Sequence, residues 1–170
     1  MTKLTLVAAV ALMTLSACAV RPVPQVGPDG QPIPVAYRIT PRDGAEIPLR
    51  VLTQINLLRT QQGMAPLALS PQLGAAAMAH SRDMSAQNRA WHFGSDGSSP
   101  VDRLQRVGYQ GRLVGEVISE TYEDELQTLA AWMEDPATRG VILDRTATKL
   151  GLAWFQEQGG KIWWTMVLAT

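Results

Sequence analysis

This sequence of 170 residues has little cysteine, no net charge and no long apolar run, and each of these properties excludes a class of structure or partner. There is one cysteine, Cys18, so no disulfide can form within the chain. Basic and acidic residues number 15 each, and this balance argues against nucleic acid as a partner. The apolar run from Leu4 to Leu15 is shorter than the roughly 20 residues that a membrane-spanning helix needs.

That short run belongs to a segment with the order of a bacterial secretory signal. Lys3 precedes it, and Leu15-Ser16-Ala17-Cys18 ends it. The ending resembles the lipobox of bacterial lipoproteins, in which cleavage precedes a cysteine that becomes diacylated. We predict a signal peptide over residues 1–17 and a lipid anchor on Cys18; the alternative is a small residue near an ordinary cleavage site. Ala19 follows, not the aspartate that favours inner-membrane retention, so we expect an outer-membrane lipoprotein at the cell envelope.

Proline dominates the next part of the chain. Seven prolines lie between residues 21 and 48, together with glycines and polar residues. This composition favours extended conformations, so we predict a spacer over residues 18–47. The remaining residues, 48–170, suffice for one domain with a modest hydrophobic core.

Within that domain, helical patterns come first and strand patterns come last. Helices are predicted from residue 51 to Gly63, from Pro71 to Met84, over residues 100–107 and 122–134, and after Pro136. Strands are predicted over residues 114–119, 150–155 and 162–168, with a turn at Gly159-Gly160 between the last two. This order predicts an α+β fold, in which helices cover a small, mostly antiparallel sheet.

Apolar stripes indicate which face is buried in two of the predicted helices. The stripe of the helix that begins at Pro71 consists of Leu73, Ala76, Ala77, His80 and Met84. The stripe of the helix over residues 122–134 consists of Leu126, Leu129, Ala130 and Met133.

Several motifs then occur in the order that one family has them. They are Asn56-Leu57-Leu58-Arg59, Gly63, Pro66-Leu67, Ser70-Pro71, His92 through Pro100, Arg103, Gly108-Tyr109, Gly115-Glu116-Val117-Ile118 and Trp132. This series resembles bacterial CAP domains, also called SCP-like or sperm-coating-protein domains. The resemblance covers nearly the whole domain and implies an α-β-α sandwich with a central cleft.

In the family, the cleft gathers two histidines and two acidic residues that can hold a divalent metal. His92 matches the first histidine and Glu116 the first glutamate. The second histidine is missing, because Thr138 and Trp163 stand at the two places where family members have it.

The second acidic position of the family falls on Glu134 or Asp135, for which the competing interpretation is a solvated carboxylate at a helix end. A catalytic zinc ion needs about three protein ligands plus water. The set His92, Glu116 and Asp135 is therefore weak and incomplete, and we expect at most weak zinc binding.

The other histidine and the late tryptophans are assigned to the core. His80 lies on the buried stripe, where we expect its ring nitrogens to be satisfied locally. Trp154, Trp163 and Trp164 could form an aromatic wall for a lipid or glycan, but aromatic residues in terminal strands are more often core.

These observations favour a non-enzymatic binding or interaction module at the cell envelope, with a degenerate metal-type cleft. Its expected partners are the membrane, through lipidated Cys18, and a lipid, a cell-wall fragment or an envelope protein. The alternative is a metal-dependent hydrolase that acts on peptide or cell-wall substrates through His92 and Glu116.

The lipobox gives a direct test. Cys18→Ser removes the thiol that would be acylated, so the variant should leave the detergent phase in phase partitioning, whereas the wild type should enter it. Unchanged partitioning of the variant would refute the anchor.

Overall fold

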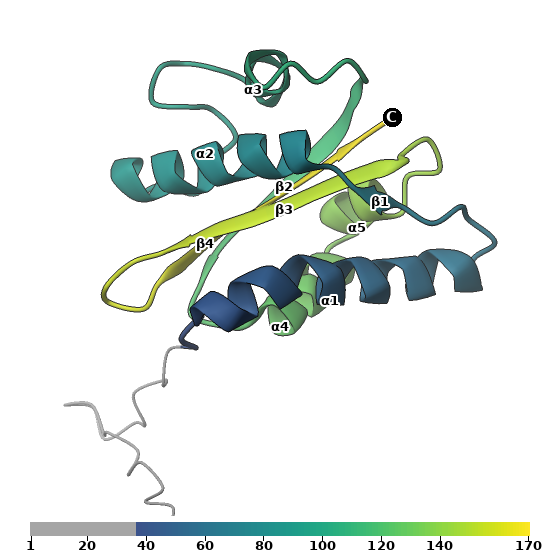
Figure 1. Ribbon diagram of the computed structural model, residues 1–170, viewed down its shortest axis with the longest axis horizontal. Helices are drawn as coiled ribbons and strands as arrows, with labels where there is room; N and C mark the ends of the chain where they lie inside the picture. Colours follow the sequence, from purple (N-terminus) through teal and green to yellow (C-terminus); the bar gives the residue numbers. More distant parts are fainter. Residues whose placement is uncertain (1–36) are drawn as a thin grey trace, which may run out of the picture. The chain divides into compact units, whose positions relative to one another are not determined.

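The computed structural model describes residues 37–170, which form an α-β-α sandwich (Figure 1). The predicted signal peptide, Cys18 and the predicted spacer up to residue 36 lie outside the described residues. Four strands form one sheet, and helices cover both of its faces. The predicted α+β class is confirmed.

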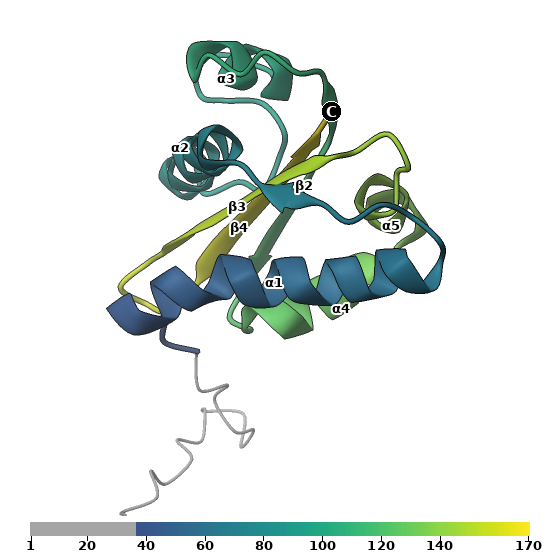
Figure 2. The ribbon, with the colours of Figure 1, turned by 45° about the vertical axis from the view of Figure 1, so that its right-hand side comes forward.

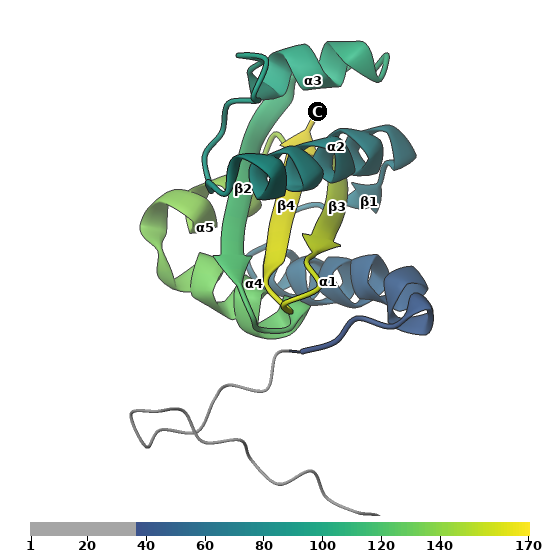
Figure 3. The ribbon, with the colours of Figure 1, turned by 90° about the vertical axis from the view of Figure 1, so that its left-hand side faces the viewer.

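The sheet has the strand order β1-β3-β4-β2. β3 (Lys149–Gln156) and β2 (Leu113–Thr121) both pair antiparallel with β4 (Ile162–Ala169), which lies between them (Figure 3). The predicted turn joins β3 to β4, and Gly160 adopts a φ of 100° there, which favours glycine. β1 (Ala68–Leu69) adds a parallel pairing with β3 that the sequence did not predict, because two residues are too few to show a strand pattern.

The helices divide between the two faces of the sheet (Figure 2). α1 (Pro41–Gln61), α4 (Glu125–Glu134) and α5 (Pro136–Ile142) lie on one side, and α2 (Pro71–Gln87) and α3 (Pro100–Arg106) lie on the other.

β4 is buried along its whole length and contributes to two hydrophobic cores. Trp164, Met166 and Leu168 belong to the core under α1 and α4, whereas Val167 and Ala169 belong to the core under α2. Trp163 is fully buried and Trp154 packs against the first core, so these tryptophans are core residues.

α1 begins seven residues before the domain boundary that the sequence predicted at residue 48. Thr40 caps the helix by accepting a hydrogen bond from the Asp43 backbone, while the Asp43 carboxylate accepts one from the Thr40 backbone. Pro41 is the first helical residue, a position that suits proline. Ile47 is fully buried, so the residues just before 48 belong to the domain and not to the spacer.

The buried face of α2 matches its predicted stripe, whereas the buried face of α4 matches only in part. All five stripe residues of α2 are buried, and Ser70 caps this helix as expected. On α4, Leu129 is buried, but Leu126 is 40% exposed. The buried face of α4 is rotated because it includes Glu125, whose carboxylate accepts a hydrogen bond from Arg50 of α1 at 2.7 Å.

α2 approaches β3 very closely at Gly151. A Cβ atom at that position would collide with the backbone of Leu73 and Gly74, and the nearby contacts are made by Ala76, Ala77 and Ala153. Small residues on both elements therefore set the spacing between this helix and the sheet.

We expect Gly151→Ala to lower the free energy of unfolding by about 1–3 kcal/mol, because the added methyl group meets backbone that cannot yield. Gly140→Ala in α5 is the control, since its added Cβ would meet no neighbour and alanine favours helix. Urea denaturation of both variants checks this. Equal effects of the two substitutions would contradict the close packing.

Candidate functional site

The centre of the candidate site is the carboxylate of Glu116, on β2. Its neighbours Gly115 and Val117 face α5 and the core under α1. Because successive side chains of a strand alternate, Glu116 points to the opposite face, where α2 and α3 lie. Its side chain is only 2% exposed, so its charge needs a partner inside the protein.

Arg103 of α3 supplies that partner. Its Nη2 donates to both carboxylate oxygens of Glu116, at 2.9 and 2.7 Å. The same nitrogen donates to the backbone carbonyl of His92 at 3.1 Å, and Nη1 donates to that of Ser98 at 3.1 Å. The Arg103 side chain is 6% exposed, so the two charges form a buried ion pair.

The start of α3 places this arginine. Ser99 caps the helix by accepting a hydrogen bond from the Asp102 backbone, and the Asp102 carboxylate accepts one from the Ser99 backbone. Pro100 occupies the first helical position. Arg103 follows one turn later, on the side of the helix that faces β2.

His92 approaches Glu116 from the loop between α2 and α3. Its Nδ1 lies 3.0 Å from the Glu116 Oε1, and about half of its side chain is exposed. The two residues thus meet at hydrogen-bonding distance, as the family motifs led us to expect. The imidazole lies between the buried carboxylate and solvent.

His80 approaches the same carboxylate from α2 and is completely buried. Its Nε2 lies 2.9 Å from the Trp91 carbonyl oxygen and 3.6 Å from the Glu116 Oε1. Since a carbonyl only accepts hydrogen bonds, Nε2 bears the hydrogen. Burial lowers the pKa of His80, despite the opposing effect of Glu116, and favours the neutral ring.

The neutral ring then leaves Nδ1 as an acceptor, and this buried atom has no hydrogen-bond partner among the described residues. The expectation that both ring nitrogens of His80 are satisfied is therefore right for Nε2 and wrong for Nδ1.

Asp135, the remaining member of the predicted metal set, does not complete the site, and neither does Thr138 at the position of the missing histidine. Asp135 caps α5 by accepting a hydrogen bond from the Ala137 backbone, and the Thr138 hydroxyl donates to the Trp132 carbonyl. α5 packs against the face of β2 opposite Glu116. Within residues 37–170, no group of three or more His, Cys, Asp or Glu side chains is arranged to hold a metal ion.

The residues present therefore do not fit the metal that the resemblance implies. Both oxygens of Glu116 already accept hydrogen bonds from a guanidinium. Arg103 was one of the family motif residues in the sequence, but we predicted no role for it there. The signal that could have given one is the missing second histidine, because a buried glutamate without metal ligands around it needs another cation.

Comparisons with known proteins agree with this fold. Residues 52–168 match the profile of CAP, described as the cysteine-rich secretory protein family. An uncharacterised protein of Bacillus subtilis, YkwD, is 29% identical over 114 residues, which are 67% of this chain and 44% of YkwD. The chain thus spans less than half of that relative.

Solved structures are similar too, and two of them illustrate this. An outer surface protein of Borrelia burgdorferi has a TM-score of 0.70 at 14% identity, over 79% of this chain and 98% of that protein, a likeness of fold alone. An extracellular protein of Bacillus anthracis that contains an SCP domain has a TM-score of 0.64 at 25% identity, over 79% of this chain and 45% of that one.

Two arginines of α3 provide a matched test of the site. Arg103→Met leaves the buried Glu116 without its cation and should lower the free energy of unfolding by about 3–5 kcal/mol. Arg106→Met removes an arginine whose ion pair with Asp96 is mostly exposed, and should change stability little. Denaturant unfolding at neutral pH measures both. Similar losses of stability in the two variants would mean that the buried Arg103–Glu116 pair contributes no more to stability than the exposed Arg106–Asp96 pair.

Proposed function

Because this chain belongs to the CAP family, we propose that it is an extracytoplasmic binding module held at the cell envelope by lipidated Cys18. Its family is one of extracellular and secreted proteins. No helix among residues 37–170 is long and apolar enough to cross a membrane. In this proposal, membrane attachment comes from the lipid on Cys18, and the domain is presented to the surrounding compartment.

The ion pair between Arg103 and Glu116 is the observation that carries the proposal. A metal ion at this position would have to displace a guanidinium that makes four hydrogen bonds, with Glu116, His92 and Ser98. It would also have to leave that guanidinium buried without a carboxylate to compensate its charge, which is costly. An internal cation thus takes the place that a metal would need.

The alternative, a metal-dependent hydrolase acting through His92 and Glu116, is not supported by this arrangement. A hydrolytic metal needs about three protein ligands and a position for water. Glu116 is committed to Arg103, and Asp135 is committed to the start of α5. We therefore propose binding without metal-dependent catalysis.

The exposed part of the site suits recognition. His92 is held by Glu116 yet half exposed, and Phe93 beside it is 48% exposed. Trp91 packs at 5.7 Å from the Phe93 ring, and Arg89 stacks on Trp91. A fixed imidazole among aromatic groups can contact a lipid, a cell-wall fragment or an envelope protein.

Zinc titration calorimetry tests the proposal. The wild type should show no saturable site at micromolar zinc, because both oxygens of the Glu116 carboxylate are hydrogen-bonded to the Arg103 guanidinium. Arg103→Ala frees Glu116 beside His80 and His92, so this variant should bind zinc more tightly than the wild type.

Glu116→Gln is the control for both forms, because it removes the carboxylate with little change in shape. Micromolar or tighter binding by the wild type that Glu116→Gln abolishes would show a working metal site. The binding-module proposal would then be wrong.

A further inference from the structure

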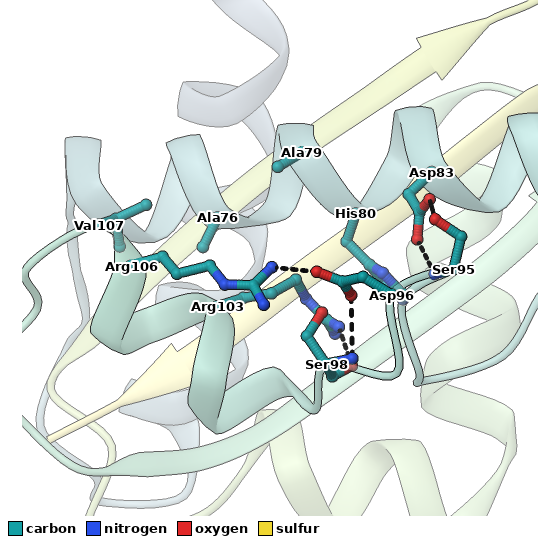
Figure 4. A pocket seen from close by; sticks show the side chains of 10 residues that line it. All are labelled: Ala76, Ala79, His80, Asp83, Ser95, Asp96, Ser98, Arg103, Arg106 and Val107. Atoms are coloured by element: carbon teal, nitrogen blue, oxygen red, sulfur yellow. Dashed lines mark hydrogen bonds and ion pairs between the residues drawn. The ribbon is translucent and has the colours of Figure 1, made fainter.

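A cavity of about 270 Å³, lined in part by Arg103, lies between α2, α3 and the loop that joins them (Figure 4). Ala76, Ala79 and Val107 form its apolar wall. The polar wall comes from His80 and Asp83 of α2, the loop residues Ser95, Asp96 and Ser98, and the two arginines of α3. A cavity of this size admits a small molecule or one end of a larger one.

One buried hydrogen-bond acceptor on α2 has no donor within the described residues. His80 points from α2 toward this space and lines it (Figure 4), and its buried Nδ1 is an acceptor without a donor among the described residues. An unsatisfied buried acceptor is costly, so a donor placed here is stabilised.

Asp83, one turn along the same helix, supplies an unpaired charge. Its carboxylate accepts hydrogen bonds from the backbone and hydroxyl of Ser95, at 2.7 and 2.6 Å, and from Gln87 at 2.9 Å. All three donors are neutral. Within the part of the chain that the structure describes, no cation lies within ion-pair distance of Asp83.

The other charges around the cavity already compensate one another. Arg103 pairs with Glu116, and Arg106 pairs with Asp96 at 2.6 Å. Hydrogen bonds from Ser98 and from Arg106 lower the pKa of Asp96, so that carboxylate is ionised and satisfied. The cavity therefore has one uncompensated negative charge, on Asp83, beside the bare acceptor of His80.

We propose that this cavity binds the primary ammonium group of a small amine. An ammonium group has one positive charge and three hydrogen-bond donors, so it can neutralise Asp83 and donate to His80. A hydroxyl group would satisfy only the hydrogen bond, and a quaternary ammonium would satisfy only the charge. The inference rests on the proposed binding function and names its ligand class.

Arg106 and Asp96 line the cavity on its solvent-exposed side, since their paired side chains are 59% and 51% exposed. An exposed pair separates at little energetic cost, so it does not block entry. The ammonium could belong to a free amine or to the ethanolamine headgroup of a lipid, since both present the same chemistry.

Calorimetry of the purified full-length protein with ethanolamine and with ethylene glycol tests the proposal. The two probes have the same size and differ in the ammonium group. Ethanolamine should bind, and ethylene glycol should bind at least about tenfold more weakly, because hydrogen bonds to charged groups are the stronger ones. Failure of ethanolamine to bind, or equal affinity for the two probes, would overturn the proposal.

Three variants locate the binding. Asp83→Asn should weaken ethanolamine binding at least about tenfold, whereas Glu123→Gln, which removes an exposed carboxylate outside the cavity, should leave it unchanged. Ala79→Leu should abolish binding by placing a larger apolar side chain in the cavity from an exposed position of α2, without altering any polar group. Binding that survives in a folded Ala79→Leu protein would overturn the assignment to this cavity.

Soluble headgroups distinguish the two sources of the amine. Glycerophosphoethanolamine should bind better than glycerophosphocholine, which has no N–H donor, if a lipid headgroup is the ligand; preference for ethanolamine over both indicates a free amine. Equal binding of the two headgroups would contradict recognition of N–H donors. The zinc titration is independent of these outcomes, so the ammonium site can fail while the metal-free binding proposal stands.

Discussion

A carboxylate buried inside a domain must be neutralised, and in this protein that requirement organises the site around Glu116. Removal of a charge from water costs several kcal/mol unless a partner of good geometry compensates it. Arg103 is that partner, and its remaining donors fix the carbonyls of His92 and Ser98. One ion pair thereby ties β2, the start of α3 and the loop between α2 and α3 into a single unit.

An arginine in this position differs from a metal in one consequential way. A guanidinium does not lose its proton in proteins, so Glu116 keeps its partner over the whole physiological pH range. A metal ion, by contrast, binds through ligands that must be deprotonated, and its occupancy depends on pH and supply. The ion pair therefore does not depend on a metal supply, and His92 lies against a carboxylate that keeps its partner.

The sequence could predict what local signals determine. Ser70 and Pro71 mark the start of α2, and the turn before β4 follows from its glycines. The start of α1 was misplaced because Pro41 suits both a spacer and a first helical position. The contact of His92 with Glu116 followed from the family motifs, but the ion pair with Arg103 depends on how α3 packs over β2. No spacing along the chain encodes that packing.

The same small residues that let α2 pack closely also create the cavity beside it. Ala76 contacts the core above β3 and β4, where Gly151 allows the helix to approach, and it also lines the cavity toward α3. A larger residue there would fill the cavity but push the helix away from the sheet, at a cost of about 1–3 kcal/mol. α3 cannot move in to close the gap, because Arg103 holds it to Glu116. Close packing against the sheet thus fixes the position of α2, and the Arg103–Glu116 ion pair fixes the position of α3. The cavity between the two helices stays open as a result.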